Sequence, residues 1–315
     1  MKNIAVFGSI NMDFIARTSR LPIPGETIIG YDFQNLPGGK GANQAVACAR
    51  LGAETMMIGC VGSDIFGDNI ITELKNSKVD VSLISRNNRV STGVALIAVN
   101  ETGENSIIII PGANEKVGEN ELMILEGALE KANILLLQLE IPIDTVLQAA
   151  ILGKEKKVTV ILDPAPVQKF PEELLRLVDI FTPNEIETAS LVGFNIDNWD
   201  KTSDAAHIFL QKDVRQSVIK LGNRGALLAN QKFEQIYPSV PVEAIDTVGA
   251  GDAFNGALAV ALNEGKTINE AVQWGNAAGA FAATKKGTQT AMPNRSELMV
   301  MLEKFSSSNR SYTRI

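Results

Sequence analysis

Short apolar runs, which predict buried strands, alternate along most of the chain with patterns that predict helices. The strand runs are residues 4–7, 55–60, 134–139, 158–162, 180–181 and 217–221. The helical patterns are residues 43–51, 66–76, 119–131, 144–156, 185–192 and 203–212. This alternation predicts an α/β fold, in which helices cover both faces of a mostly parallel central sheet. Ligands of such sheets bind beyond the carboxyl ends of the strands. Residues 8–11, Glu140 and Asp163 lie at predicted strand ends, so chemistry is expected there.

Two segments interrupt this alternation. Residues 12–35 contain prolines and a glycine and then an extended run over 26–33. Residues 91–111 contain two strand patterns, 93–99 and 106–110, and the polar turn between them predicts a hairpin. Strands without a helix cannot bury a face by themselves, so they predict a small sheet that covers another part of the molecule. The alternative is a β insertion without a function.

The chain therefore divides into two predicted units. A large α/β unit comprises residues 1–11, 36–90 and 112–315, and a small β unit comprises residues 12–35 and 91–111.

Composition is that of an ordinary soluble protein. The 315 residues are 45% hydrophobic and 21% charged, and the net charge of −7 gives no support to nucleic-acid binding. No apolar run approaches the roughly 18 residues that a membrane span needs, and the N-terminus reads as a first strand rather than a signal sequence. We expect a cytoplasmic protein with no membrane or nucleic-acid partner. Cys48 and Cys60 are expected to be buried and structural.

The single histidine, His207, narrows the possible chemistry. Hydrolases with a Ser-His-Asp or Cys-His arrangement need a histidine base, and zinc hydrolases usually need several histidine ligands. His207 lies in a helical pattern without a neighbouring carboxylate cluster, so we expect it to be structural or at the surface. A base for proton transfer is then expected to be a carboxylate or a lysine.

Residues 246–253 contain the most informative pattern. Gly249, Ala250 and Gly251 precede the carboxylate of Asp252, and a helical pattern over 254–262 follows. Small residues let backbone N–H groups converge at a helix N-terminus, where they can hold an anion. A carboxylate beside such an anion hole can accept a proton from an attacking hydroxyl group, as phosphoryl transfer requires. The alternative is a glycine-rich turn with Asp252 as the helix N-cap.

A second glycine-rich segment, Gly38-Gly39-Lys40-Gly41-Ala42-Asn43-Gln44, leads into another predicted helix. In this order, the two segments resemble those of the ribokinase/PfkB-type carbohydrate kinases. Further matching segments span nearly the whole chain: residues 8–13, 91–96, 138–140, 182–185 and 221–225. Within the family, residues 38–44 are most similar to those of the kinases that act on ribose.

The resemblance implies ATP-dependent phosphorylation of D-ribose to D-ribose 5-phosphate, with Mg²⁺ bridging the phosphates of ATP. It implies that Asp252 is the base and that the N–H groups of Gly249, Ala250 and Gly251 form the anion hole with that of Asp252. The implied sugar-binding residues are Asn11, Asp13, Gly39, Lys40, Asn43, Glu140 and Asp252. Taken singly, Asn43 also reads as a helix cap, Asp13 as a turn residue and Lys40 as a solvated charge.

The nucleotide-binding residues implied by the resemblance are Asn184, Lys220, Gly222, Asn223, Gly225, Gly251 and Asn276. Glu187 falls in the region that contacts magnesium, although Asn184 and Glu187 also fit a helix capping box, and both roles are compatible. Lys220 departs from the threonine that often stands at this position. A K⁺ site is implied at Asp246 and the backbone carbonyls of Val248, Ala282, Lys285 and Gly287, with Ala291 where a serine ligand is common.

Two alternatives stay open. The chain could phosphorylate another sugar or nucleoside, such as deoxyribose, fructose or adenosine, although Lys40 and Asn43 favour a free polyhydroxy sugar. It could also be a sugar- or nucleotide-binding protein without catalysis, which the intact residues 249–252 argue against. The resemblance further implies that the large unit binds nucleotide and substrate, and that the small β unit of residues 12–35 and 91–111 is a lid that covers the sugar site and forms a homodimer contact.

Overall fold

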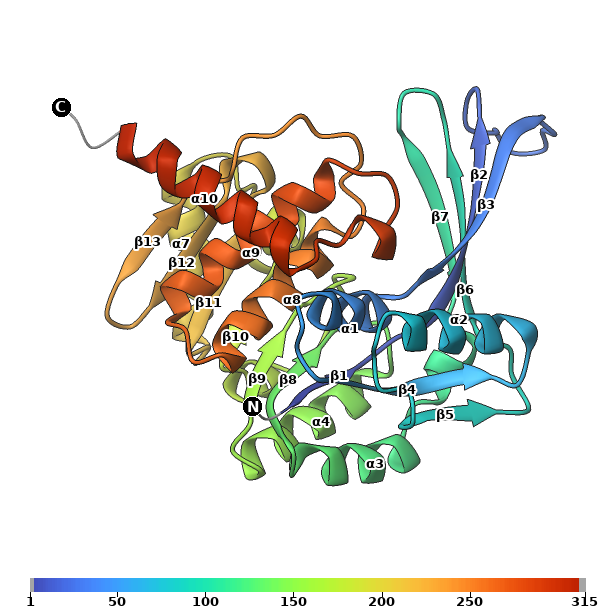
Figure 1. Cartoon of the computed structure of the whole chain (residues 1–315), viewed down its shortest axis with the longest axis horizontal. Helices are drawn as coiled ribbons and strands as arrows, with labels where there is room; N and C mark the ends of the chain where they lie inside the picture. Colours follow the sequence, from blue (N-terminus) through green and yellow to red (C-terminus); the bar gives the residue numbers. More distant parts are fainter. Residues whose placement is uncertain (1–2, 312–315) are drawn as a thin grey trace.

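The computed structural model describes residues 3–311 and has a large α/β body from which a smaller sheet projects (Figure 1). The large sheet has nine strands in the order β13-β12-β11-β10-β9-β8-β1-β4-β5. Every neighbouring pair from β11 to β5 is parallel, and β12 and β13 are antiparallel additions at one edge. The predicted α/β class is confirmed. The strands are β1 Asn3–Phe7, β4 Thr55–Gly62, β5 Ile84–Asn87, β8 Ala132–Leu137, β9 Thr159–Leu162, β10 Ile180–Phe181, β11 Gln216–Lys220, β12 Ala226–Asn230 and β13 Glu234–Tyr237.

The central strands are apolar on both faces because helices cover both. Ile4 and Val6 of β1 belong to one core, and Ala5 and Phe7 belong to the other, as the alternation of side chains along a strand requires. The helices are α1 Lys40–Arg50, α2 Ile65–Asn76, α3 Glu119–Leu129, α4 Ile143–Glu155, α5 Glu173–Arg176, α6 Glu185–Val192, α7 Trp199–Gln211, α8 Ala250–Asn263, α9 Ile268–Ala283 and α10 Arg295–Ser311. Short 3₁₀ turns are η1 Gly112–Lys116, η2 Gly222–Arg224 and η3 Gln289–Ala291.

The second sheet has the order β3-β2-β6-β7 and stands apart from the body (Figure 1). Its strands are β2 Asn11–Thr18, β3 Gly30–Gly38, β6 Gly93–Val99 and β7 Asn105–Ile110. The predicted hairpin is β6 and β7. The predicted extended run over 26–33 was wrong in position, because β3 starts at Gly30 and continues to Gly38, where it pairs with Asn11. The pairing partner, which a local pattern does not show, fixes these ends.

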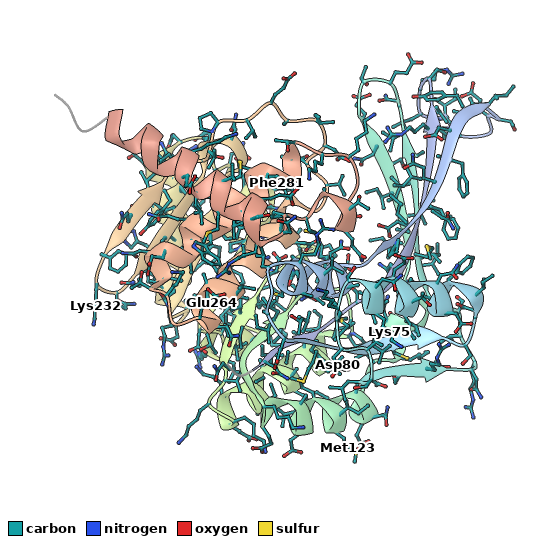
Figure 2. The ribbon with its side chains drawn as sticks, in the orientation of Figure 1. Lys75, Asp80, Met123, Lys232, Glu264 and Phe281 are labelled. Carbon is teal, nitrogen blue, oxygen red and sulfur yellow. The ribbon has the colours of Figure 1, made fainter. Side chains whose placement is uncertain are left out.

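Several elements were not predicted. The strands β5, β12 and β13 are short or lie at a sheet edge, and α9 is buried around most of its circumference, so it lacks a one-sided apolar stripe. Lys232, in the turn between β12 and β13, marks the sheet edge opposite the lid (Figure 2). No helix within residues 3–311 is long and apolar enough to cross a membrane. The cytoplasmic location stays a prediction.

Two smaller predictions are confirmed. His207 is exposed on α7, and its Nε2 lies 3.8 Å from an oxygen of Glu234, so it is a surface residue. Cys48 and Cys60 are both buried and free.

Candidate active site

Glycines allow α1 to begin against the loop that follows β1. Gly39 precedes the helix with a φ of 86°, a conformation that favours glycine. A Cβ atom at Gly41 would lie only 2.7 Å from the backbone nitrogen of Ser9. The backbone amide of Lys40 then reaches Oε2 of Glu140 at 3.0 Å. The glycine-rich segment therefore serves a close approach of two backbones at the strand ends.

The second glycine-rich segment forms the N-terminus of α8. Its N-cap is Gly249, with a φ of 78°, so the N-cap interpretation of Asp252 was wrong. Asp252 is in the first turn of the helix. The Ala250 amide donates to the carbonyl of Thr247 at 3.2 Å. The amides of Gly251 and Asp252 belong to the group that an α-helix leaves without an intrahelical acceptor, and these can meet an anion.

The carboxylate of Asp252 is buried and held by two side-chain amides of α1. Nδ2 of Asn43 donates to Oδ2 at 3.0 Å, and Nε2 of Gln44 donates to Oδ1 at 3.1 Å. Burial raises the pKa of Asp252 to about 6, against the lowering effect of Lys40 and of the two amides. Asp252 is therefore mostly ionised at neutral pH and yet basic enough to accept a proton. Asn43 does not cap a helix, which corrects that alternative.

Charged groups surround the space next to Asp252. Burial, together with the charges of Glu140 and Asp252, raises the pKa of Asp13 to about 7. Burial alone would lower the pKa of Lys40, but the carboxylates around it raise the pKa above its ordinary value. Lys40 is thus a half-buried cation within a carboxylate cluster rather than a solvated charge, and Asp13 lies in β2 rather than in a turn.

Asn11 is fixed in the same region. Its Oδ1 accepts a hydrogen bond from Nδ2 of Asn114 at 2.6 Å, and Oδ1 of Asn114 accepts one from the backbone of Ile10 at 2.9 Å. The structure therefore gathers the predicted sugar residues Asn11, Asp13, Gly39, Lys40, Asn43 and Glu140 around Asp252. Polar groups with fixed donors and acceptors suit a polyhydroxy ligand.

One face of the lid sheet turns toward the body. Side chains alternate along β2, so Asp13, Ile15 and Arg17 share a face. Ile15 and Arg17 line a cavity of about 450 Å³ whose opposite wall includes Asp246 and Gly287. The lid face that carries Asp13 therefore lies over the region between the sugar cluster and the loop before α8.

A larger cavity of about 670 Å³ begins at Lys40 and Asp252 and extends along the N-terminus of α8. It is lined by all the predicted nucleotide residues: Asn184, Lys220, Gly222, Asn223, Gly225, Gly251 and Asn276. Nδ2 of Asn276 donates to the carbonyl of Tyr237 at 3.0 Å, which fixes the amide. Asp163, which follows a strand, also lines the cavity, and the structure adds lining residues that the sequence did not indicate, among them Val240, Val242, Phe254 and Ala280.

Two side-chain pairs line one part of this cavity. Nζ of Lys220 lies 2.9 Å from Oδ1 of Asp163, and both side chains are almost fully buried. Asn184 and Glu187 form the predicted capping box of α6, with Glu187 accepting from the Asn184 backbone at 2.7 Å. Burial raises the pKa of Glu187, whereas the charge of Lys220 lowers it.

The residues predicted to hold a monovalent cation come together at two adjoining loops. Oδ1 of Asp246 accepts from the Val248 amide at 3.0 Å, and Oδ2 accepts from the Gly287 amide at 3.3 Å. The Lys285 amide donates to the carbonyl of Ala282 at 3.1 Å. Ala291 is buried in η3 and offers no side-chain oxygen. Within residues 3–311, no group of His, Cys, Asp and Glu side chains forms a metal site by itself.

Comparisons with known proteins agree with this geometry. The pfkB family of carbohydrate kinases matches residues 1–295. A ribokinase of Haemophilus influenzae is 40% identical over 302 residues, which are 96% of this chain and 99% of that protein. A deoxyribokinase of Salmonella typhi is 36% identical over 293 residues, covering 93% of this chain and 96% of that protein. A structure of Arabidopsis thaliana ribokinase complexed with ribose and ATP has a TM-score of 0.88 at 35% identity and covers 96% of this chain and 99% of that one.

The chain belongs to the pfkB family of carbohydrate kinases. It is an enzyme of the sugar-kinase class, with the two sheets that this class of fold combines. The sequence reasoning expected chemistry at Asp163 from its position at a strand end but gave it no role, and it gave Gln44 no role in the site. Gln44 stands next to Asn43 in the glycine-rich segment, and Asp163 directly follows β9, so the position at a strand end was the available signal.

Proposed function

We propose that this kinase transfers the γ-phosphoryl group of ATP to D-ribose and produces D-ribose 5-phosphate. The observation that carries the proposal is the buried carboxylate of Asp252, held by Asn43 and Gln44 in the first turn of α8. The likeness to proteins named ribokinase, one of them complexed with ribose and ATP, supports ribose as the acceptor.

In the proposed reaction, Asp252 accepts the proton of the sugar hydroxyl group as that oxygen attacks the γ-phosphorus. The new oxygen–phosphorus bond forms, the bond to the bridging oxygen breaks, and ADP leaves with the electron pair. The amides of Gly249, Ala250 and Gly251, with that of Asp252, stabilise the negative charge of the transferring group. The Ala250 amide must then exchange its contact with Thr247 for the phosphoryl group or share it.

The sugar is proposed to lie in the cluster of Asn11, Asp13, Lys40, Asn43 and Glu140. Its hydroxyl groups would donate hydrogen bonds to the like-charged carboxylates of Asp13, Glu140 and Asp252. The nucleotide is proposed to occupy the cavity of about 670 Å³, with its phosphates at Lys220 and Gly251 and its base near Asn276. Mg²⁺ bound to ATP would neutralise phosphate charge, and Glu187 is among the residues that line that cavity.

A K⁺ ion is proposed to bind between the loops that Asp246 joins, with carbonyl groups of Val248, Ala282, Lys285 and Gly287 as ligands. The support is the bridging of both loops by one carboxylate. Such a cation would stabilise the loop that presents the anion hole. The test is turnover with K⁺ replaced by tetramethylammonium. We expect a several-fold loss of kcat, and an unchanged kcat would remove the cation from the mechanism.

The lid is proposed to form a homodimer contact as well as to cover the sugar. All of β7 is exposed, although it contains four consecutive isoleucines, Ile107 to Ile110. Exposed apolar surface of this kind often marks an interface between proteins. Sedimentation-velocity centrifugation of the purified protein tests the assembly, and a monomer at micromolar concentration would refute it.

A second acceptor, 2-deoxyribose, is supported by the likeness to a deoxyribokinase. A coupled assay of ADP release with ribose, 2-deoxyribose, fructose and adenosine decides between them. We expect the highest kcat/KM with ribose. A preference for 2-deoxyribose would keep Asp252 and the fold and change the acceptor, whereas no turnover with any of them would contradict the proposed reaction and favour a binding protein.

A further inference from the structure

A buried side-chain amide lies between the proposed base and the phosphate end of the nucleotide cavity. Nε2 of Gln44 donates to Oδ1 of Asp252 at 3.1 Å and to Oδ2 of Asp163 at 3.0 Å. The other oxygen of Asp163 is 2.9 Å from Nζ of Lys220. One amide group thus touches two carboxylates, one at the sugar side and one at the phosphate side.

A second glutamine side chain fixes the orientation of this amide. Nε2 of Gln138 donates to Oε1 of Gln44 at 2.8 Å. A flipped amide would place Oε1 of Gln44 between two carboxylates and lose three hydrogen bonds. Gly8 makes room for this arrangement, because a Cβ atom there would lie 1.9 Å from Oε1 of Gln138. The chain of contacts therefore runs from Gly8 through Gln138 and Gln44 to Asp252.

Gln44 acts on the site without touching the substrates. It is fully buried and lines neither of the two cavities described above. We propose that Gln44 is the positioning residue that fixes the carboxylate of Asp252 for proton transfer and ties it to the Asp163–Lys220 pair. This inference rests on the proposed function, in which Asp252 is the base.

The local charges explain why such a residue is needed. Lys40 of α1, Asp163 after β9 and Asp13 of β2 act on Asp252. Glu140 and Glu187 act on Lys40, and Lys220 pairs with Asp163. Asp163 and Asp252 repel each other, and the two N–H groups of Gln44 offset that repulsion by stabilising both ionised forms. Without them, the pKa of Asp252 rises and its carboxylate loses one of its two side-chain anchors.

The test is the pH profile of kcat at saturating sugar and ATP for Gln44→Met, which keeps the length of the side chain and removes the amide. Asp252 works in its ionised form, so a higher pKa moves the acid limb of the profile to higher pH. We expect a shift on the order of one pH unit and a plateau kcat lower by about 10-fold. The KM for the sugar should change less than kcat. A folded Gln44→Met enzyme with both the limb and kcat of the wild type would overturn the proposal.

Two controls separate positioning from a general loss of stability. Thr202→Val removes a buried hydroxyl group that donates to the carbonyl of Asn198 at 2.8 Å, far from the site on α7, and should leave the limb in place. Asp13→Asn shows which carboxylate produces the acid limb. A limb that belongs to Asp252 persists when the carboxylate of Asp13 is removed. If Gln44→Met does not fold, Gln138→Met removes only the group that orients Gln44. That variant should shift the limb in the same direction by a smaller amount, and an unshifted limb would overturn the proposal.

Asp252→Asn distinguishes this inference from the proposed function. If that variant turns over normally, Asp252 is not the base and both proposals fail. If it is inactive while Gln44→Met behaves as the wild type, only the role of Gln44 fails.

Discussion

The large sheet and the lid sheet use similar apolar residues in opposite ways. Every residue of β4 is buried between helices, whereas every residue of β7 is exposed. The body can therefore hold charged groups such as Asp252 and Lys220 in fixed positions, away from water. Within residues 3–311 no helix covers β7, and the lid packs on the body near its base, through contacts such as that of Phe14 with Phe66 of α2 and of Asn11 with Asn114. The comparison supports the proposal that the body carries the reaction and that the lid covers the sugar and forms the dimer contact.

The largest expected effect follows a change in the body. Asp252→Asn keeps the shape of the side chain and removes the proton acceptor. We expect kcat to fall by about 10²- to 10⁴-fold, while sugar affinity measured by calorimetry changes only a few-fold. Near-normal turnover would show that the chemistry does not depend on the buried carboxylate.

The next effect tests the phosphate end of the same body. Lys220→Met leaves Asp163 buried without its cation, so we expect a loss of about 3 kcal/mol in the free energy of unfolding. The kcat/KM for ATP should fall by about 10- to 100-fold, and the KM for the sugar should change less. Lys212→Met is the matched control, because Lys212 pairs with Glu172 at the surface at 2.7 Å. A loss of stability in both variants alike would contradict the special role of the buried pair.

A smaller effect, with the opposite sign for stability, concerns the junction of lid and body. The pKa of Asp13 is about 7 in the folded protein, above its ordinary value of 3.8. Ionisation of Asp13 therefore lowers the free energy of unfolding, with the full effect above about pH 7. The effect disappears as the pH falls below 3.8, the ordinary pKa of the group. Asp13→Asn should raise the free energy of unfolding at pH 8 by about 1 to 3 kcal/mol, with a smaller gain at pH 5, and should weaken sugar binding.

Thermal unfolding of the sugar-free protein at the two pH values measures this gain. Glu101→Gln, in the exposed turn of the β6–β7 hairpin, is the control for removing a lid carboxylate and should change nothing. If Asp13→Asn lowered the stability at pH 8, the claim that the ionised Asp13 side chain destabilises the folded protein would be refuted.

The smallest effect on the folded chain is expected from the lid alone. Ile108→Lys places a charge on exposed β7 and should weaken the proposed dimer by more than about tenfold while leaving the stability of the body unchanged. Sedimentation velocity over a concentration series measures the dissociation constant. Ile65→Lys, at an exposed position of α2 in the body, is the control. Equal behaviour of the two variants would show that the lid surface is not the interface.

The sequence predicted the body well because its signals are local. Apolar runs gave the parallel strands, and glycines next to Lys40 and Asp252 indicated the two helix starts where the site lies. The same glycines are required by close backbone approaches and by positive φ at Gly39 and Gly249. Residues at strand ends, such as Asp163, could be found by position, although not by role.

Local patterns failed where a partner decides the outcome. The ends of β3 depend on pairing with β2. The strand β12 pairs with the edge of β11, and β13 pairs in turn with β12. The exposed strand β7 is as rich in apolar residues as the buried strand β4, so composition alone did not show which of them is buried. Pairing and burial are properties of two segments together.

The sequence by itself determined the family, the two-sheet organisation and most residues of the site, because each is encoded in a short run of neighbouring residues. Only the tertiary structure decided that Gln44 links Asp252 to Asp163, over separations of 208 and 119 positions. It also decided that Lys40 is a half-buried cation among carboxylates and that Asp252 carries a raised pKa. The physical reason is that desolvation and charge–charge interaction depend on distances in space, which are set only when the sheet and its helices pack together.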